Sequence, residues 1–292
     1  MTEIPDRTVR RPIVVGVDGS PNGRLALQWA LDEAERWRCA VEVIHAWHNP
    51  LIGTPDEYPP ELVRAGQMED AARALLDREV GPAPAVEVHL HALHGSPARA
   101  LVERSEGASL VVVGRHGAGF HQLLGNVADQ VAHHAACPVV VVSDRAPTAT
   151  DTGIVVGVDG SPEAAAAARW AHAEADRRGV PVLAVLAWPL VEQLTGSNPN
   201  DLELPFDDEA AHHALDTALR AALGAHADVV ERRTVRALAT DALREAAQDA
   251  ALTVVGARGL GGFRALLIGS VSRALLETAP SPTVVVRAPW GP

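Results

Sequence analysis

The sequence predicts two consecutive α/β domains, each built on a parallel sheet. The pentapeptide Gly-Val-Asp-Gly-Ser occurs twice in the 292 residues, at Gly16–Ser20 and Gly157–Ser161. A second glycine-rich segment also recurs, at Gly114–Gly117 and Gly256–Gly259, with almost the same offset along the chain. Such self-similarity indicates a duplicated unit. Within each copy, short apolar runs alternate with amphipathic stretches, which is typical of parallel strands joined by right-handed helical crossovers.

The elements of the first half follow in chain order. The β-branched run Ile13–Val17 predicts a strand buried on both faces of the sheet. Ser20 and Pro21 then predict a helix start, because serine caps free backbone N–H groups and proline loses no hydrogen bond at the first helical position. The same reasoning predicts strands at Val41–Ala46, Val86–Leu90, Leu110–Val113 and Val139–Val142, helices at about 61–79, after Ser96-Pro97 and at about 124–135, and a proline-rich connection at Asn49–Pro60.

The second half repeats this order. Asp207, Asp208 and Glu209 predict the start of a helix, where acidic side chains complement the helix dipole. Strands are expected at Ile154–Val158, Val182–Ala187, Val229–Val235, Leu252–Val255 and Thr283–Val286, with a Pro/Asp-rich connection at Pro189–Asp208. Asp144–Gly153, which carries Ala, Pro and Thr, indicates a linker, so we expect domains at residues 9–144 and 152–288.

Composition restricts the partners and the compartment. The formal net charge is −12 and there is no basic run of the kind that tracks a phosphate backbone, which argues against nucleic acid as a partner. No apolar run reaches the roughly 18 residues that a membrane span needs. Residues 1–11 are polar and charged, so no signal peptide is expected and the cytoplasm is the predicted location. Cys39 and Cys137 form no Cys-x-x-Cys pair and suit free, buried thiols in a reducing compartment.

The chain contains no lysine, and its 25 lysine-plus-arginine positions are all arginine. A P-loop needs a lysine on the β/γ-phosphates of its nucleotide. An enzyme that uses pyridoxal phosphate needs a lysine for the Schiff base, and a protein kinase needs its strand lysine. The sequence therefore excludes these three classes.

The two repeated signatures fall where a parallel sheet binds ligands, beyond the carboxyl ends of its strands. Asp18 and Asp159 follow the first strand of each half, and Gly114 and Gly256 follow the fourth. A glycine-rich turn that enters a helix exposes backbone N–H groups and the positive end of the helix dipole, which suits phosphate. Glycine is expected there because a Cβ would block the approach of the backbone to the anion. The two aspartates are equally well explained as ligand contacts or as turn formers.

In the second half this segment has glycine, two residues, glycine, nine residues and then Gly-Ser, from Gly256 to Ser270. Together with Gly-Val-Asp-Gly-Ser and a valine-rich closing strand, the pattern resembles the ATP-binding motif of universal stress proteins. The resemblance covers about Arg11–Ser143 and again Gly153–Arg287. It implies that each half is a Rossmann-like domain, a five-stranded parallel sheet sandwiched by helices.

The resemblance also implies which residues contact the nucleotide, ATP with or without Mg²⁺. In the second half they are Val158, Asp159, Ala187, Val255, Gly256, Gly259, Gly269, Ser270 and Val271. In the first half the matching positions are Val17, Asp18, Ala46, Val113, Gly114, Gly117, Gly125, Asn126 and Val127. Arg258 and Arg264 are further candidates that would add positive charge.

The first half departs from the family pattern at two points. Only seven residues separate Gly117 from Gly125, against nine between Gly259 and Gly269. Asn126 also replaces the expected serine or threonine, although asparagine can still cap a helix. These departures favour the second half as the ATP site.

Other polar residues have simpler interpretations. His89, His91 and His94 could form a metal cluster, but no cysteine or paired carboxylate joins them, which favours a solvated face of a peripheral strand. Ser20 and Ser161 do not lie in a Gly-x-Ser-x-Gly motif, and helix capping accounts for both.

The sequence favours a binding protein over an enzyme. It carries no His-x-Gly-His, Lys-Met-Ser-Lys-Ser or Ser-Gly-Gly-x-Asp-Ser signature of adenylyl-transferring enzymes. The leading hypothesis is an ATP-binding stress-response regulator without a dedicated catalytic apparatus. The alternatives are an interaction module that needs no nucleotide and a slow ATPase. In the family the closing strands pair antiparallel, so Val139–Val142 and Thr283–Val286 are expected to join the halves as an internal pseudo-dimer; a homodimer of the whole chain is a further option.

Overall fold

Ten strands form one continuous sheet in the computed structural model, which describes residues 10–47, 65–81, 84–117, 124–144, 152–188, 207–260 and 267–290. The strands are β1 (Ile13–Gly16), β2 (Val41–Trp47), β3 (Val88–His94), β4 (Leu110–Gly114), β5 (Val139–Val142), β6 (Ile154–Gly157), β7 (Val182–Ala187), β8 (Glu231–Val235), β9 (Leu252–Gly256) and β10 (Thr283–Val286). Their order is β3-β2-β1-β4-β5-β10-β9-β6-β7-β8. All neighbours within each half are parallel, whereas β5 and β10 pair antiparallel.

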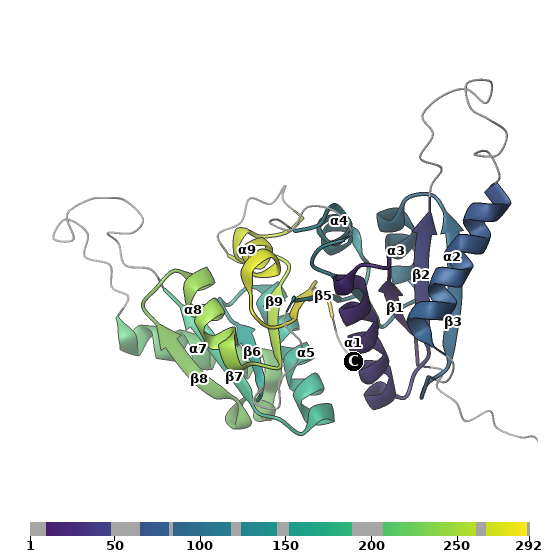
Figure 1. The fold of residues 1–292 in the computed structure, drawn as a ribbon. Helices are drawn as coiled ribbons and strands as arrows, with labels where there is room; N and C mark the ends of the chain where they lie inside the picture. Colours follow the sequence, from purple (N-terminus) through teal and green to yellow (C-terminus); the bar gives the residue numbers. More distant parts are fainter. Residues whose placement is uncertain are drawn as a thin grey trace, which may run out of the picture.

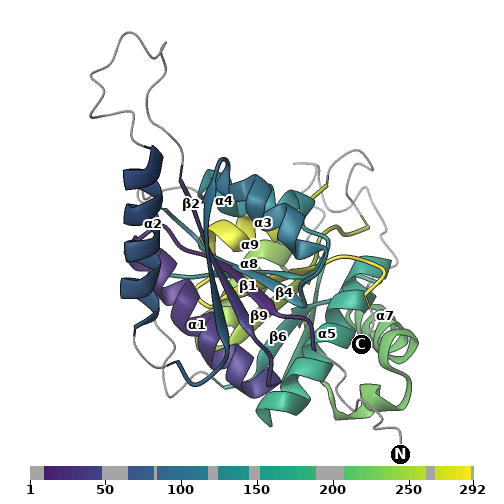
Figure 2. The same cartoon turned by 90° about the vertical axis from the view of Figure 1, so that its right-hand side faces the viewer.

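Helices cover both faces of this sheet (Figures 1 and 2). They are α1 (Pro21–Trp37), α2 (Ala65–Val80), α3 (Pro97–Ser105), α4 (Asn126–His134), α5 (Pro162–Arg178), α7 (Asp208–Leu223), α8 (Ala239–Ala246) and α9 (Ser270–Thr278), with 3₁₀ turns η4 (Gly224–Val229) and η5 (Ala247–Asp249). One apolar core lies under α1, α2, α5 and α7, and a second lies under α3, α4, α8 and α9. The predicted fold class, two α/β units with five parallel strands each between helical layers, is confirmed.

The helix starts predicted from capping residues are observed. The hydroxyls of Ser20 and Ser161 accept hydrogen bonds from backbone N–H groups three residues ahead, at 3.0 and 3.1 Å. Asp207 accepts in the same way at 2.8 Å and so begins α7. Each of these bonds satisfies one of the N–H groups that a helix leaves unpaired at its start. The capping interpretation of both serines is therefore confirmed.

Both edge strands begin later than predicted. β3 starts at Val88 rather than Val86, and β8 starts at Glu231 because the residues before it form the 3₁₀ turn η4. Val229, predicted to begin that strand, is 71% exposed in this turn. An apolar side chain at an edge can stay in solvent at modest cost, so the apolar pattern defines edge strands poorly. The connections predicted at 49–60 and 189–208, the linker after Asp144 and the candidate Arg264 lie mostly or wholly outside the described residues.

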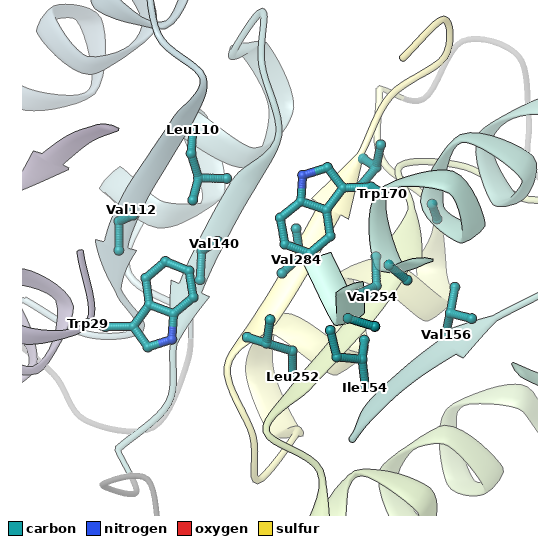
Figure 3. Close-up of a cluster of buried hydrophobic side chains, with 14 of the residues drawn as sticks. Trp29, Leu110, Val112, Val140, Ile154, Val156, Trp170, Leu252, Val254 and Val284 are labelled. Carbon is teal, nitrogen blue, oxygen red and sulfur yellow. The ribbon is translucent and has the colours of Figure 1, made fainter. Parts of the chain in front are cut away.

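The two halves pack equivalent side chains at equivalent places in their apolar cores. Trp29 on α1 packs over the first-half strands near Val112 and Val140, and Trp170 on α5 takes the equivalent place over the second-half strands near Val284 (Figure 3). Both indoles are buried, with exposures of 7% and 1%. In a chain with so few aromatic residues, these two large side chains fill space that valine and alanine leave between helix and sheet.

The halves are joined at the centre of the sheet and by two arginines. In the β5–β10 pairing Val140 lies opposite Val284. Arg115 of the first half donates to the carbonyl of Ala279, the residue that ends α9. In the reverse sense Arg287 donates to the carbonyl of Ala135, which ends α4, at 3.0 Å. Each half thus caps the C-terminus of a helix in the other, where a positive charge is favourable.

Helices α1 and α5 also meet, and they bury two carboxyl groups between them (Figure 1 shows them side by side). Glu33 and Glu174 occupy equivalent positions of the repeat, and neither is exposed. Arg178 donates to Glu174 on its own helix and to Glu33 Oε2 across the boundary. Trp37 Nε1 donates to Glu174 Oε2 at 3.0 Å, and Arg177 stacks 4.7 Å from the Trp37 ring.

The pKa values of these two carboxyls shift in opposite directions. Burial raises the pKa of Glu33 to about 8, and the neighbouring Glu174 adds to that rise while Arg178 and Arg36 oppose it. Burial also pushes the pKa of Glu174 upward, but its hydrogen bond with Glu33 and the nearby arginines outweigh burial and hold that pKa below its ordinary value. At neutral pH the pair therefore shares one proton and carries one negative charge, with burial favouring the proton and the arginines favouring the charge.

The structure bears on two expectations drawn from composition, namely that no segment spans a membrane and that the two cysteines are free and buried. None of the helices in the described residues is both long enough and apolar enough to span a membrane. Cys39 and Cys137 are free, as predicted, but both are only partly buried, because each sits at the end of an element instead of inside the core. Burial raises the pKa of the Cys137 thiol to about 12, which leaves it protonated and unreactive at neutral pH.

Candidate functional site

The first half holds a cavity of about 410 Å³ at the carboxyl ends of β1, β2 and β4. We name it the first pocket. All nine positions predicted for this half line it: Val17, Asp18, Ala46, Val113, Gly114, Gly117, Gly125, Asn126 and Val127. Its walls are completed by apolar side chains that the motif did not include, chiefly Ile44, Leu101 and Leu124. The volume lies within the range of roughly 300–1,000 Å³ usual for small-molecule sites.

The second half holds the equivalent cavity, of about 230 Å³, which we name the second pocket. It too is lined by all nine predicted positions: Val158, Asp159, Ala187, Val255, Gly256, Gly259, Gly269, Ser270 and Val271. Leu243 and Val185 supply its apolar wall, and Arg258 lies at its polar side. The sequence had favoured this half, yet its cavity is the smaller of the two.

A helix N-terminus opens into each pocket without a side-chain cap. The N-cap residues are Gly125 for α4 and Gly269 for α9, and neither has a side chain to offer. The first N–H groups of both helices are therefore available to an anionic ligand, and the helix dipole favours one. Asparagine can cap a helix, but Asn126 does not cap α4. It is the first helical residue, and its Oδ1 accepts a hydrogen bond from Gln130 at 2.9 Å instead.

Asp159 joins the two signature turns of its half. Its Oδ1 accepts from the N–H of Ser161 at 2.9 Å, and its Oδ2 accepts from the N–H of Leu260 at 2.9 Å. Asp18 makes the matching bond to the N–H of Ser20 at 3.0 Å. The carboxylate thus forms the turn after the first strand and also holds the turn after the fourth. Of the two roles the sequence left open, turn formation is observed directly.

The glycines have a structural reason that differs from the one predicted. A Cβ on Gly256 would lie 2.7 Å from the backbone of Glu163, and one on Gly114 would lie 2.7 Å from the backbone of Asn22. A Cβ on Gly259 would lie 2.3 Å from Asp159 Oδ2. These glycines allow strand ends, helix starts and the aspartate to pack closely. The expected reason, space for an approaching anion, is not what these three contacts show.

The two pockets differ in the charged group at the equivalent wall position. In the second pocket Arg258 is 44% exposed and its guanidinium binds Glu163 Oε1 through two nitrogens, at 3.0 and 2.6 Å. In the first pocket this position is His116, which is only 8% exposed and lies 3.5 Å from the Asp144 carboxylate. Asn22 takes the place of Glu163 and donates to Asp144 at 2.9 Å. Aligning the two halves of the sequence shows that these residues differ, but only the structure shows which partners each of them contacts.

The described residues fit an adenine nucleotide better than they fit a protein-bound metal. Apolar walls suit a base, and the uncapped helix start suits phosphate. Among the described residues that line the second pocket, Asp159 is the only one with a carboxylate, and both of its oxygens already accept backbone N–H groups. No group of three His, Cys, Asp or Glu side chains arranged for a metal occurs in the part of the chain described. Any Mg²⁺ would therefore be carried by the phosphates of the ligand.

The histidines of β3 have local partners. His91 accepts a hydrogen bond from the Arg104 guanidinium through one ring nitrogen and lies 3.6 Å from Glu42, and its burial lowers its pKa. His89 is half-exposed and lies 3.4 Å from Glu87. Strand β3 is at the edge of the sheet, as expected, and these side chains lie away from both pockets.

Comparisons with known proteins agree over both halves. The sequence matches the model of the "Universal stress protein family" at residues 10–143 and 152–287. A universal stress protein of Mycolicibacterium smegmatis is 33% identical over 286 residues, covering 94% of this chain and 96% of its own. Universal stress protein Rv2623 of Mycobacterium tuberculosis is 32% identical over 289 residues with the same coverage. A solved universal stress protein from Archaeoglobus fulgidus matches 95% of this chain and 98% of its own, with a TM-score of 0.69 and 18% identity.

Proposed function

The chain belongs to the universal stress protein family, and we propose that it is a cytoplasmic, adenine-nucleotide-binding regulator with its ATP site in the second pocket. The observation that carries this proposal is the convergence of nine separated positions on one cavity in each half. These positions come from three strand ends, a glycine-rich turn and a helix start. That combination supplies an apolar slot for a base beside backbone N–H donors for phosphate.

Each part of the second pocket has a distinct task in this proposal. The base enters between Ala187 and the apolar wall that includes Leu243. The phosphates lie over the start of α9, where Ser270 and Val271 present N–H groups. Asp159 holds the turn after β6 against the turn after β9, so it keeps the phosphate-binding backbone in place before a ligand arrives.

A regulator also needs a route by which one site affects another. Helix α9 starts at the second pocket, and its last carbonyl, that of Ala279, accepts from Arg115 of the first half. Arg115 in turn lies between Gly114 and His116, which line the first pocket. A ligand that shifts α9 would therefore also shift Arg115 and, through it, the neighbouring residues that line the first pocket. We propose that the halves act through this contact as an internal pseudo-dimer.

We propose that the protein lacks a dedicated catalytic apparatus. The second pocket offers a phosphoryl group only backbone N–H groups and Arg258, and phosphoryl transfer depends on positioning together with strong charge stabilisation. A turnover assay that follows release of inorganic phosphate separates binding from hydrolysis. Steady hydrolysis that Arg258→Met abolishes would favour the slow ATPase instead.

The binding proposal is tested with matched glycine variants. Protein purified without added nucleotide is denatured and its released small molecules are identified by mass spectrometry, and ATP binding is measured by titration calorimetry. Gly269→Val is expected to weaken ATP binding by about tenfold or more, because its branched side chain covers the helix start. Gly269 has φ −80° and a Cβ there meets only atoms at 3.5 Å or beyond, so the fold should survive. Gly107→Val is the control, since a Cβ there contacts a single atom at 4.0 Å.

Two outcomes would count against the proposal. Absence of adenine nucleotide from the purified protein, together with absence of ATP binding by calorimetry, would favour an interaction module that needs no nucleotide. Equal loss of binding in Gly269→Val and Gly107→Val would show that the measured binding does not use the second pocket.

A further inference from the structure

We propose that the two pockets select adenine ligands of different charge, so that the first pocket binds a nucleoside or nucleoside monophosphate in preference to ATP. The second pocket would keep the opposite preference. This inference rests on the proposed function, because it assumes that both cavities take an adenine ligand. It reverses the expectation drawn from the sequence, in which the first half was a weakened copy of the same ATP site.

The first argument is the fixed charge at the polar end of each pocket. The second pocket has Arg258, whose guanidinium uses two nitrogens on Glu163 and is still 44% exposed, so it retains N–H groups that can donate to a phosphate. At the equivalent position the first pocket has His116, held beside the Asp144 carboxylate. Asp144 is 53% exposed and lies 3.5 Å from His116, so it places a negative charge next to this wall of the first pocket.

The arginine of the first-half segment is directed elsewhere. Arg115 lies one position before His116, is 7% exposed, and donates to the carbonyl of Ala279 in the other half. Among the described residues that line the first pocket, there is consequently no arginine. Arg115, which could have bound a triphosphate, instead binds a carbonyl at the boundary between the halves.

The second argument is the start of the helix that faces the phosphate. In α9 the first turn contains no acidic residue. In α4 the first turn contains Asp129, whose charge opposes the positive end of the helix dipole. Asp129 lies 3.7 Å from both His133 and Arg273, and the Arg273 guanidinium offsets part of its charge without removing it from the helix start. Both helices still offer N–H groups, so a single phosphate remains acceptable in the first pocket while a triphosphate is disfavoured.

The third argument is shape. The first pocket has almost twice the volume of the second, about 410 against 230 Å³. Ile44 and Leu101 have the equivalents Val185 and Leu243 in the second pocket, whereas Leu124 adds an apolar side chain to the first. A larger apolar cavity with a weak cationic end gains more from burying base and ribose than from holding charge. The second pocket, smaller and with a cation at its end, gains more from the phosphates.

The test isolates each pocket within the full chain. Ala46→Trp fills the first pocket and Ala187→Trp fills the second, since these alanines are equivalent, only partly buried and line the cavities from strand ends. Dissociation constants for adenosine, AMP and ATP are measured by calorimetry at pH 8 on both variants. The ratio Kd(ATP)/Kd(adenosine) is expected to be about tenfold or more higher for the first pocket (Ala187→Trp) than for the second (Ala46→Trp), because one or two charge-assisted hydrogen bonds distinguish them.

Charge variants complete the design. In the Ala187→Trp background, Asp144→Asn should tighten ATP binding several-fold and leave adenosine binding unchanged. In the Ala46→Trp background, Arg258→Met should weaken ATP by about tenfold and leave adenosine unchanged. Circular dichroism and thermal melts identify any variant that fails to fold, and the Asp144→Asn change at an exposed side chain provides a mild alternative.

The outcomes separate the two proposals. Equal ATP-to-adenosine ratios in the two pockets would overturn the charge selection. Binding of ATP in the second pocket with neither adenosine nor AMP bound in the first would also overturn it while leaving the proposed function intact. Failure of every ligand in both pockets would remove the proposed function itself.

Discussion

Replacing Glu33 by glutamine should flatten the dependence of stability on pH above neutrality. The pKa of Glu33 rises from its ordinary value of 4.5 to about 8 in the folded protein. Between these values the folded state holds a proton that the unfolded chain has released, so the free energy of unfolding falls as pH rises. The slope for one proton is about 1.4 kcal/mol per pH unit, which amounts to about 2 kcal/mol between pH 6.5 and 8. Above pH 8 both states are ionised and the loss is complete.

Glutamine preserves the contacts of the protonated acid. Its amide N–H can donate to the Glu174 carboxylate, and its carbonyl can accept from Arg178, as Glu33 Oε2 does now. Its neutrality removes the coupled proton. Relative to the unmodified protein, the variant should therefore gain about 2 kcal/mol between pH 6.5 and 8.5.

The assay is urea denaturation across this pH range, with the free energy of unfolding extrapolated at each pH. Glu103→Gln is the control, because that carboxylate is 63% exposed in a surface pair and its removal should leave the slope unchanged. The double variant Glu33→Gln/Glu174→Gln should lose about 3 kcal/mol or more at every pH, since it leaves Arg178, whose side chain is 11% exposed, without a counter-charge. An unaltered slope in Glu33→Gln would refute the shared proton.

Three further predictions concern packing and the boundary. Gly256→Ala should lower the free energy of unfolding by about 1–3 kcal/mol, with or without ATP, because its Cβ would overlap a helix backbone. Urea denaturation measures this loss, and a variant that loses only ATP binding and keeps its stability would contradict the prediction. Asp159→Ala should lower the free energy of unfolding by about 1–3 kcal/mol, because it leaves two turn N–H groups unpaired. Limited proteolysis should then cut the chain after Gly259 faster, and unchanged cleavage would show that Asp159 does not hold the two turns together. Arg287→Met and Arg115→Met should each cost about 1–3 kcal/mol by uncapping a helix of the other half, and unchanged denaturation midpoints would show that these bonds contribute little.

The interior strands were predictable from local pattern. Val182–Ala187 and Thr283–Val286 were predicted to the residue, because a continuous apolar run flanked by turn residues has one low-energy place, inside a parallel sheet. Edge strands such as β8 were less predictable, since a strand with one open side needs fewer apolar residues and its start depends on a neighbouring turn.

The candidate site was predictable as a set of positions but less so in its chemistry. The eighteen positions that the family resemblance implied all line one of the two pockets. The apolar walls were missed, because Leu101 and Leu243 sit in helices whose motif-free sequences give no sign of facing a cavity. The sequence also did not show whether Asn126 caps α4. A shift of one residue in the start of a helix decides which residue is its N-cap.

Local sequence is enough to predict that the chain folds twice into the same unit, because apolar periodicity, capping and turn chemistry act over a few residues and repeat with them. The differences between the copies arise from contacts that form only on folding. Arg115 is one arginine among many in the sequence, and because it points toward Ala279, no arginine occurs among the described residues that line the first pocket. Glu33 and Glu174 are ordinary helix residues until the halves meet and bury them together. Charge and protonation depend on neighbours that lie far away in the chain, and those neighbours are known only once it is folded.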